Sequence, residues 1–314
     1  MSKKVVIALG GNAINRAGEI GTIAEQFKNT RKALNGVIDV IKLGYNVILT
    51  HGNGPQVGNS LIRVEAGHER RIPLRPLGVL VADTEGGIGY MIEQSLQNEL
   101  IRQSISKEVV TLLSQVVVDK NDPKMKDPSK PVGPFYSEED AKRLSEERGW
   151  SIKEDSGRGW RRVVPSPLPQ KIVEENVIKF LVDNNTIVIT CGGGGIPVCQ
   201  EADRTYEGVD GVIDKDFASA LLGNITGAES LVIATGVEKV AINFGKENQE
   251  DLSEITVAEC YKYIEENQFA AGSMLPKIEA SIRFLENGGK EVFITLPETI
   301  SDALVGKNGT RIIP

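Results

Sequence analysis

Three apolar runs in this sequence each end in a cluster of glycines, and this feature limits the possible folds most strongly. The runs and the clusters that follow them are Val5–Leu9 with Gly10–Asn12, Tyr45–Thr50 with Gly52–Gly54, and Thr186–Thr190 with Gly192–Gly195. Short runs that are apolar throughout suit parallel strands, which are buried on both faces of a sheet. Because ligands of open α/β sheets bind beyond the carboxyl ends of the strands, the glycine clusters mark candidate binding loops for an anion.

Helical patterns alternate with these apolar runs. Apolar residues from Phe27 to Ile41 recur on one helical face, and Gly44 is a suitable stop for that helix. We expect further helices at Ile88–Gln103, Ile172–Asp183 and Ile278–Glu286, and further strands at Val109–Val118, Ser230–Ala234 and Glu291–Thr295. The repeated order of strand, glycine loop and helix predicts an α/β sandwich on a mainly parallel sheet, with residues 1–314 as one domain.

One segment, residues 121–165, interrupts this alternation. It holds ten Lys or Arg and nine Asp or Glu, together with five prolines and both tryptophans, Trp150 and Trp160. The segment is too long for an ordinary connection between elements. We expect an inserted subdomain that projects from the sheet, because the tryptophans need partners to pack against. A plain surface excursion is the alternative.

Composition excludes several classes of protein. The chain has 36 Lys and Arg against 43 Asp and Glu, a net charge of −7, which does not suit a general nucleic-acid binder. Three cysteines give no disulfide framework and favour a reducing compartment, and two histidines are too few for a His-rich metal site. The sequence has no apolar run long enough for a membrane span, and its N-terminal run is too short for a signal peptide, so we expect a cytoplasmic location.

Several familiar catalytic signatures are missing from the sequence. It contains neither the G-x-x-x-x-G-K-[ST] of a P-loop nor the G-x-S-x-G of a nucleophile elbow. The glycines from Gly52 to Gly58 are spaced as G-x-G-x-x-x-G, which fits a dinucleotide-binding fingerprint poorly. Cys191 precedes four glycines and could act as a nucleophile, but a small buried residue at a strand end is the favoured interpretation.

Three lysines occur in surroundings that suit an anionic ligand. Lys215 is flanked by Asp214 and Asp216, Lys277 follows a glycine-initiated turn at a helix start, and Lys130 is framed by prolines. Each has a plain alternative as a solvated or stiffened surface residue. Phosphoryl transfer requires positioning and positive charge, and both lysines and Mg²⁺ carried by phosphates supply that charge. The sequence therefore favours a phosphate-binding crevice with lysines and without a dedicated metal cage.

These features together resemble those of the carbamate kinases, within the amino acid kinase family. The resemblance covers essentially the whole chain. The segments that carry it are VIALGGNA (6–13), HGNGPQVG (51–58), KPVGPF (130–135), EDSGRGWR (154–161), VVPSP (163–167), CGGGGIP (191–197), VIDKD (212–216) and GSMLPK (272–277). The first two segments point to the wider family, whereas the proline-framed Lys130 and the stretch from Gly157 to Arg161 resemble the carbamate kinases specifically.

The resemblance implies reversible phosphoryl transfer between ATP and carbamate, giving ADP and carbamoyl phosphate with Mg²⁺ present, by a homodimer. It implies an αβα sandwich around a sheet of about eight strands, with the 121–165 subdomain over the substrate site. By the same resemblance, the catalytic residues are Lys130, Lys215, Asp216 and Lys277, and the residues that hold the substrate are Gly10, Gly11, Asn12, Gly52, Asn53 and Gly54. The residues expected to serve the nucleotide pocket are Asp214, Thr235, Gly236, Val237, Phe244 and Met274; family members often have an aspartate where this chain has Gly236.

Two other functions stay open at the level of sequence. The first is another phosphotransferase of the amino acid kinase family, similar to an acetylglutamate or uridylate kinase; those enzymes lack the inserted segment with the proline-framed Lys130. The second is a non-catalytic nucleotide sensor on the same fold. The presence of Lys130, Lys215, Lys277 and Asp216 argues against a sensor.

Overall fold

A large mainly parallel sheet forms the centre of the molecule. The computed structural model describes residues 3–16, 18–68, 70–154 and 159–314, apart from the side chain of Asn12. Within these residues, an eight-stranded sheet has the order β15-β17-β16-β12-β1-β2-β9-β3. Its strands are β1 (Lys4–Leu9), β2 (Asn46–His51), β3 (Val109–Thr111), β9 (Ile187–Ile189), β12 (Ser230–Ala234), β15 (Glu254–Thr256), β16 (Glu291–Thr295) and β17 (Thr310–Ile313). All neighbours from β16 to β3 are parallel, and β17 is antiparallel to β16.

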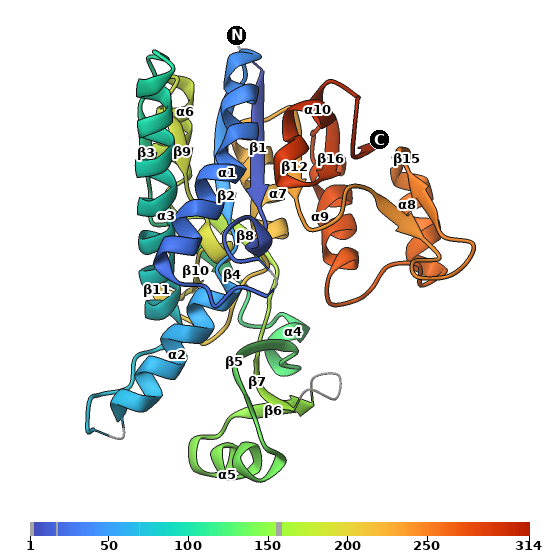
Figure 1. Ribbon diagram of the computed structural model, residues 1–314. Helices are drawn as coiled ribbons and strands as arrows, with labels where there is room; N and C mark the ends of the chain where they lie inside the picture. Colours follow the sequence, from blue (N-terminus) through green and yellow to red (C-terminus); the bar gives the residue numbers. More distant parts are fainter. Residues whose placement is uncertain (1–2, 17, 69, 155–158) are drawn as a thin grey trace.

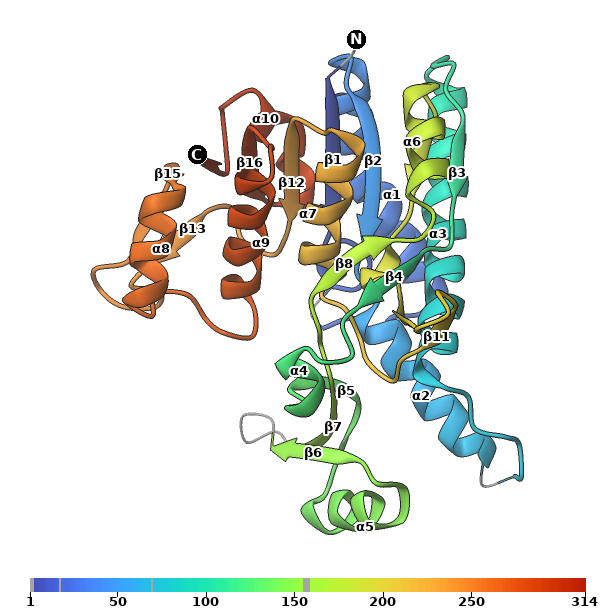
Figure 2. The same cartoon turned by 180° about the vertical axis from the view of Figure 1, so that it is seen from behind.

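Helices cover both faces of this sheet (Figure 1; the view from behind is Figure 2). On β1, Val5, Ile7 and Leu9 pack in one hydrophobic core, and Val6 packs in the core on the opposite face. The first core includes α1 (Ile23–Lys42), α3 (Leu77–Arg102) and α10 (Ile300–Leu304), and the second includes α6 (Glu175–Asp183), α7 (Lys215–Thr226), α8 (Val257–Glu265) and α9 (Met274–Glu286). The predicted αβα sandwich is confirmed.

Smaller elements extend the large sheet. A second sheet has the order β11-β10-β4-β8 and continues the core below β1 and β2 (Figure 2). Its strands are β4 (Gln115–Val118), β8 (Pro169–Ile172), β10 (Ile196–Gln200) and β11 (Tyr206–Gly208). Strands β13 (Val240–Ile242) and β14 (Glu250–Leu252) pair with each other, and the 3₁₀ turns are η1 (Gly11–Ala13), η2 (Gly192–Gly194) and η3 (Pro297–Thr299).

The 121–165 segment forms an antiparallel sheet of its own, in the order β5-β7-β6. Its elements are α4 (Pro123–Lys126), β5 (Lys130–Tyr136), α5 (Glu138–Arg148), β6 (Ser151–Glu154) and β7 (Trp160–Val164). They extend away from the large sheet, next to α2 (Gly54–His68) (Figure 1). Trp150 packs against the guanidinium groups of Arg148 and Arg162, 5.0 and 4.9 Å from its ring centre, and residues 155–158 of the quoted EDSGRGWR segment lie outside the described residues.

Several predicted boundaries were wrong. The predicted strand Val109–Val118 is interrupted, because Ser114 bonds to a side chain of α3 and the following residues join the second sheet as β4. The predicted helix Ile172–Asp183 begins at Glu175, because Ile172 belongs to β8 and pairs with Val116 of β4. Helix α2 was not predicted. Helix α3 begins well before Ile88, and three of its four glycines, Gly78, Gly86 and Gly87, lie in that first part and obscured the helical pattern. None of the described helices has the length and apolar content to cross a bilayer.

Candidate active site

Three strand ends meet closely at one edge of the large sheet. The Gly52 N–H donates to the Leu9 carbonyl at 2.9 Å, and the Gly10 N–H donates to the Ala234 carbonyl at 2.9 Å. A Cβ atom at Gly10 would lie 2.6 Å from the Ala234 oxygen, and one at Gly52 would lie 3.3 Å from the Gly11 nitrogen. The backbones therefore approach more closely at Gly10 than a side chain allows.

A cavity of about 790 Å³ opens beside these strand ends. Ten of the sequence-predicted residues line it: Gly11, Gly52, Asn53, Gly54, Lys130, Asp214, Lys215, Asp216, Thr235 and Lys277. Gly10 packs against the Ala234 carbonyl and does not line the cavity, and Asn12 lies in η1 with a side chain outside the described part of the structure. The cavity therefore unites the glycine loops with the predicted lysines.

The predicted nucleotide-pocket residues are less closely gathered. Thr235, at the end of β12, lines the cavity, and Gly236 and Val237 follow it without lining the cavity. Phe244 lies after β13 with 71% of its surface exposed. Met274 is the first residue of α9 and packs against the core. Of these five residues only Thr235 lines the cavity, so the part of the other four in nucleotide binding stays a prediction.

Two lysines share one buried carboxylate in this cavity. Lys215 Nζ lies 2.5 Å from Asp216 Oδ1, and Lys277 Nζ lies 2.8 Å from Asp216 Oδ2. The Asp216 side chain is 3% exposed, and the lysine side chains are 13% and 15% exposed. Burial alone would raise the pKa of Asp216, but the two lysines hold it below its ordinary value. The carboxylate is therefore ionised, and the cluster keeps a net positive charge beside the cavity.

A second carboxylate connects the projecting segment to the same helix. Lys130 Nζ donates to Asp214 Oδ2 at 2.8 Å, while Asp214 Oδ1 accepts the Asp216 N–H at 2.9 Å as the N-cap of α7. The Lys130 side chain is 40% exposed. Asp214 thus caps α7 and orients Lys130 at the same time.

Helix N-termini add positive potential to the cavity. Helix α2 begins at Gly54 and α7 begins at Lys215, and both of these residues line the cavity. Gly272 and Ser273, which directly precede α9, line it as well. Unpaired N–H groups and helix dipoles favour anions at such ends. Together with the lysines, they make this cavity suitable for phosphate groups.

Sequence reasoning missed a buried polar layer behind the glycine loops. Glu85 and Ser114 are hydrogen-bonded to each other there, and Asn53 Nδ2 donates to Thr84 Oγ1 at 2.9 Å. His51 is also fully buried, and burial lowers its pKa to about 4, so the imidazole is neutral. The available signal was weak: Thr84 and Glu85 sit among glycines and apolar residues in a long helix.

Cys191 lies in the same layer as a buried thiol. The residue has no exposed surface, and burial raises its pKa to about 12. A thiol that stays protonated at neutral pH is a poor nucleophile. This environment agrees with the interpretation of Cys191 as a buried strand-end residue. Cys199 and Cys260 are likewise free and buried.

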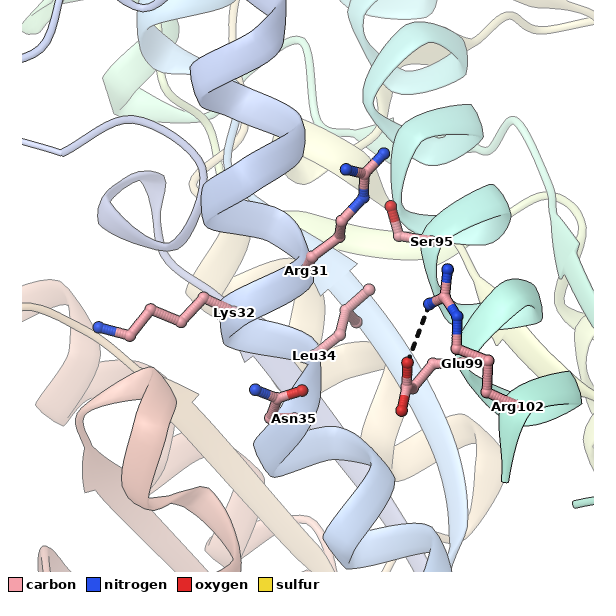
Figure 3. Close-up of a pocket in the computed structure, with 7 residues that line it drawn as sticks. All are labelled: Arg31, Lys32, Leu34, Asn35, Ser95, Glu99 and Arg102. Carbon is pink, nitrogen blue, oxygen red and sulfur yellow. Dashed lines mark hydrogen bonds and ion pairs between the residues drawn. The ribbon is translucent and has the colours of Figure 1, made fainter. Parts of the chain in front are cut away.

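A smaller cavity of about 240 Å³ lies between α1 and α3 (Figure 3). It is lined by Arg31, Lys32, Leu34, Asn35, Ser95, Glu99 and Arg102, none of them a predicted site residue. Its arginines have partners, because Arg102 pairs with Glu99 at 3.1 Å and Arg31 stacks on Phe27 at 5.3 Å. The cavity at the strand ends therefore remains the candidate active site.

Comparison with known proteins agrees with this fold. The amino acid kinase family profile matches residues 3–296, so the chain belongs to this family, and its full-length relatives show that it is a kinase. Within the family it groups with the carbamate kinases. It is 50% identical to the carbamate kinase of Pyrococcus furiosus and 49% identical to that of Pyrococcus horikoshii, each over 100% of both chains. The solved carbamate kinase from Giardia lamblia bound to AMP-PNP superimposes with a TM-score of 0.93 at 44% identity, over 99% of this chain and 98% of that one.

Proposed function

We propose that this enzyme transfers a phosphoryl group reversibly between ATP and carbamate, giving ADP and carbamoyl phosphate. The observation that carries the proposal is the Lys215–Asp216–Lys277 cluster in a cavity lined by glycine loops and helix N-termini. The choice of carbamate is supported by full-length relatives that are named carbamate kinases. Carbamate is small, planar and anionic, so backbone N–H groups and one lysine suffice to bind it.

The proposed mechanism relies on positioning and charge. Lys215 and Lys277 stabilise the negative charge that develops on the transferred phosphoryl group, and Asp216 keeps both ammonium groups in place. Gly11, Asn12, Gly52, Asn53 and Gly54 hold carbamate and the phosphoryl group in line, and Gly10 positions this loop through its hydrogen bond to the Ala234 carbonyl. When the carbamate site is filled, the Lys130 ammonium group contacts carbamate, either in place of its ion pair with Asp214 or in addition to it.

Mg²⁺ would be held here mainly by the nucleotide phosphates and water, with at most one or two carboxylates, and would supply positive charge to the phosphate oxygens. Asp214 and Asp216 are carboxylates that line the cavity, and lysines already occupy both of them. We propose that the adenine nucleotide extends from Thr235 towards Phe244 and Met274, past Gly236 and Val237. Asp214 supports the nucleotide end indirectly, by capping α7.

We further propose that residues 121–165 act as a subdomain that closes over the substrate, and that the enzyme is a cytoplasmic homodimer. Ion pairs connect this segment to the main body at Arg162–Asp210 (2.6 Å) and Arg148–Glu65 (3.0 Å). The homodimer is supported by exposed apolar residues on α6 and just after the edge strand β3, namely Val177, Phe180 and Leu113. Light scattering after gel filtration tests it, and a monomeric mass at micromolar concentration contradicts it.

The direct test of function supplies ADP, Mg²⁺ and carbamoyl phosphate and measures ATP. We expect ATP to accumulate with the wild-type protein, and a Lys277→Met protein prepared in the same way to be inactive, which excludes a contaminating kinase. Folded wild-type protein that makes no ATP contradicts the proposal. ATP-dependent phosphorylation of N-acetylglutamate or UMP indicates another amino acid kinase, and ADP binding without any turnover indicates a sensor.

A further inference from the structure

A buried carboxylate, that of Glu85 in α3, lies behind the active-site cavity. Glu85 is 1% exposed. Its described hydrogen bonds come from neutral donors: the Ser114 hydroxyl to Oε1 at 2.6 Å, the Ser114 N–H to Oε2 at 3.3 Å and the Gly192 N–H to Oε1 at 3.0 Å. Burying an acid without a cationic partner is costly. The role of Glu85 is therefore inferred from the groups that its carboxylate binds.

The carboxylate holds the glycine loop after β9. The Gly192 N–H donates to Glu85 itself, and the preceding Cys191 N–H donates to the Ser114 hydroxyl at 2.7 Å. Cys191 has a φ of 53°, and the glycines that follow Gly192 also have positive φ. A non-glycine residue in this left-handed region persists when its surroundings fix it. Glu85 and Ser114 supply that constraint to two successive N–H groups.

The same loop fixes a side chain of the active-site cavity. A Cβ atom at Gly193 would lie 2.1 Å from Asn53 Nδ2, so the loop backbone packs directly on the Asn53 amide. The same amide donates to the hydroxyl of Thr84, the neighbour of Glu85, at 2.9 Å. Both Gly193 and Asn53 line the cavity. Asn53 is thus held between Thr84 on one side and the glycine loop, which Glu85 anchors, on the other.

We propose that Glu85 is a positioning residue for phosphoryl transfer, whose carboxylate fixes the Cys191–Gly195 loop and, through Gly193, the Asn53 amide at the substrate end of the cavity. The inference rests on the proposed function, because it assigns the loop a part in substrate binding. Glu85 itself does not line the cavity, and it acts through the residues that do.

The surroundings make Glu85 the group in this layer that changes charge near neutral pH. Burial raises its pKa to about 7, opposed by the bonds from Ser114 and Gly192, and the charge of Glu174 raises it further. His51 and Glu85 both lie beside the Cβ position of Gly192, and His51 stays neutral near Lys215 while Cys191 stays a thiol. Proton uptake by Glu85 turns one acceptor oxygen into a donor. The loop then loses part of its anchor, and turnover falls as the pH drops below about 7.

The test compares Glu85→Gln with Glu93→Gln. Glu93 lies on the same helix and accepts the Thr111 N–H at 2.7 Å, so its replacement also removes a carboxylate that binds a strand. For Glu85→Gln we expect amide exchange in residues 191–195 to accelerate about tenfold and the KM for carbamoyl phosphate to rise about tenfold. Each change corresponds to the loss of about one charge-assisted hydrogen bond. The acid limb of the kcat/KM profile near pH 7 should disappear, and the Kd for ADP should stay within about twofold, as in Glu93→Gln.

A folded Glu85→Gln protein that matches Glu93→Gln in exchange, KM and pH profile overturns the proposal. Where Glu85→Gln does not fold, Ser114→Ala takes its place, because it keeps the carboxylate and removes the hydroxyl that holds Cys191. Ser114→Ala should change exchange and KM in the same direction, and unchanged values overturn the proposal. Wild-type protein without turnover contradicts the proposed function instead, and exchange in residues 191–195 still reports on Glu85.

Discussion

Lys277 Nζ and Asp216 Oδ2 lie 2.8 Å apart, although 61 positions separate the two residues in the chain. Asp216 is in the first turn of α7 and Lys277 is in the first turn of α9. The two helices lie side by side on one face of the sheet (Figure 2). Their packing therefore determines the ion pair, and the charge at the phosphoryl site depends directly on the fold.

Replacing Asp216 by Asn should abolish most activity. The change leaves Lys215 and Lys277 facing each other without the anion, and burial already lowers the pKa of Lys215. We expect kcat to fall about a hundredfold or more and the free energy of unfolding to fall by about 3 kcal/mol. ATP formation and urea unfolding measure the two effects. Asp203→Asn, in an exposed turn, is the control, and a kcat within about fivefold of wild type contradicts the role of Asp216.

Replacing Lys130 by Ala should separate activity from stability. The Lys130 side chain is 40% exposed, so loss of its ion pair with Asp214 should change the free energy of unfolding by less than about 1 kcal/mol. Turnover should fall about a hundredfold, while calorimetry should give nearly the same Kd for ADP. Lys153→Ala removes a lysine of the same segment that pairs with Asp127, and it should be silent. A large loss of ADP affinity in Lys130→Ala argues against the proposed role.

Local patterns of apolar residues were sufficient to predict the strands that each consist of one short apolar run. The strands at Ser230–Ala234 and Glu291–Thr295 have the predicted bounds, because each is an apolar run that is buried on both faces. The predicted lysines and four of the six predicted substrate-binding residues line one cavity, since parallel strands place their carboxyl ends at one edge.

Contacts between distant segments account for what the sequence did not predict. The run Val109–Val118 is mainly apolar, yet Ser114 divides it because Glu85 of another element binds its N–H and hydroxyl. Likewise, Gly193 and Asn53 meet across 140 positions of the chain. Single-residue polarity cannot show which polar side chains will be buried together, so the layer behind the glycine loops became visible in the structure alone.

Glycine at position 193 should be essential for conformational and steric reasons. Gly193 has a φ of 66°, and a Cβ there would lie 2.1 Å from Asn53 Nδ2. Gly193→Ala should therefore lower the free energy of unfolding by about 2 kcal/mol and raise the KM for carbamoyl phosphate. Gly87→Ala, in α3 with no atom near its Cβ position, should raise stability by about 0.5 to 1 kcal/mol. Equal effects of the two changes in urea unfolding contradict this account.

The pH dependence of stability should show that His51 and Glu85 oppose each other. The pKa of His51 is lowered from 6.5 to about 4, so its contribution to stability is complete above pH 6.5 and is lost as the pH falls towards 4. The pKa of Glu85 is raised from 4.5 to about 7, so its contribution is complete below pH 4.5 and is lost as the pH rises through 7. Between about pH 6.5 and 5, each contribution changes by about 1.5 kcal/mol, with opposite signs.

Glu85→Gln removes one of these two contributions and leaves the other. As the pH falls from about 6.5 to 5, the mutant should lose about 1.5 kcal/mol of stability relative to wild type, since protonation of Glu85 no longer offsets the cost of keeping His51 neutral. Urea unfolding at a series of pH values measures this difference, and contributions common to both proteins cancel in it. Glu93→Gln should follow the wild-type curve. Parallel curves for Glu85→Gln and wild type would show that Glu85 does not take up its proton in this range, and with it the proposed pH dependence of the glycine loop would fail.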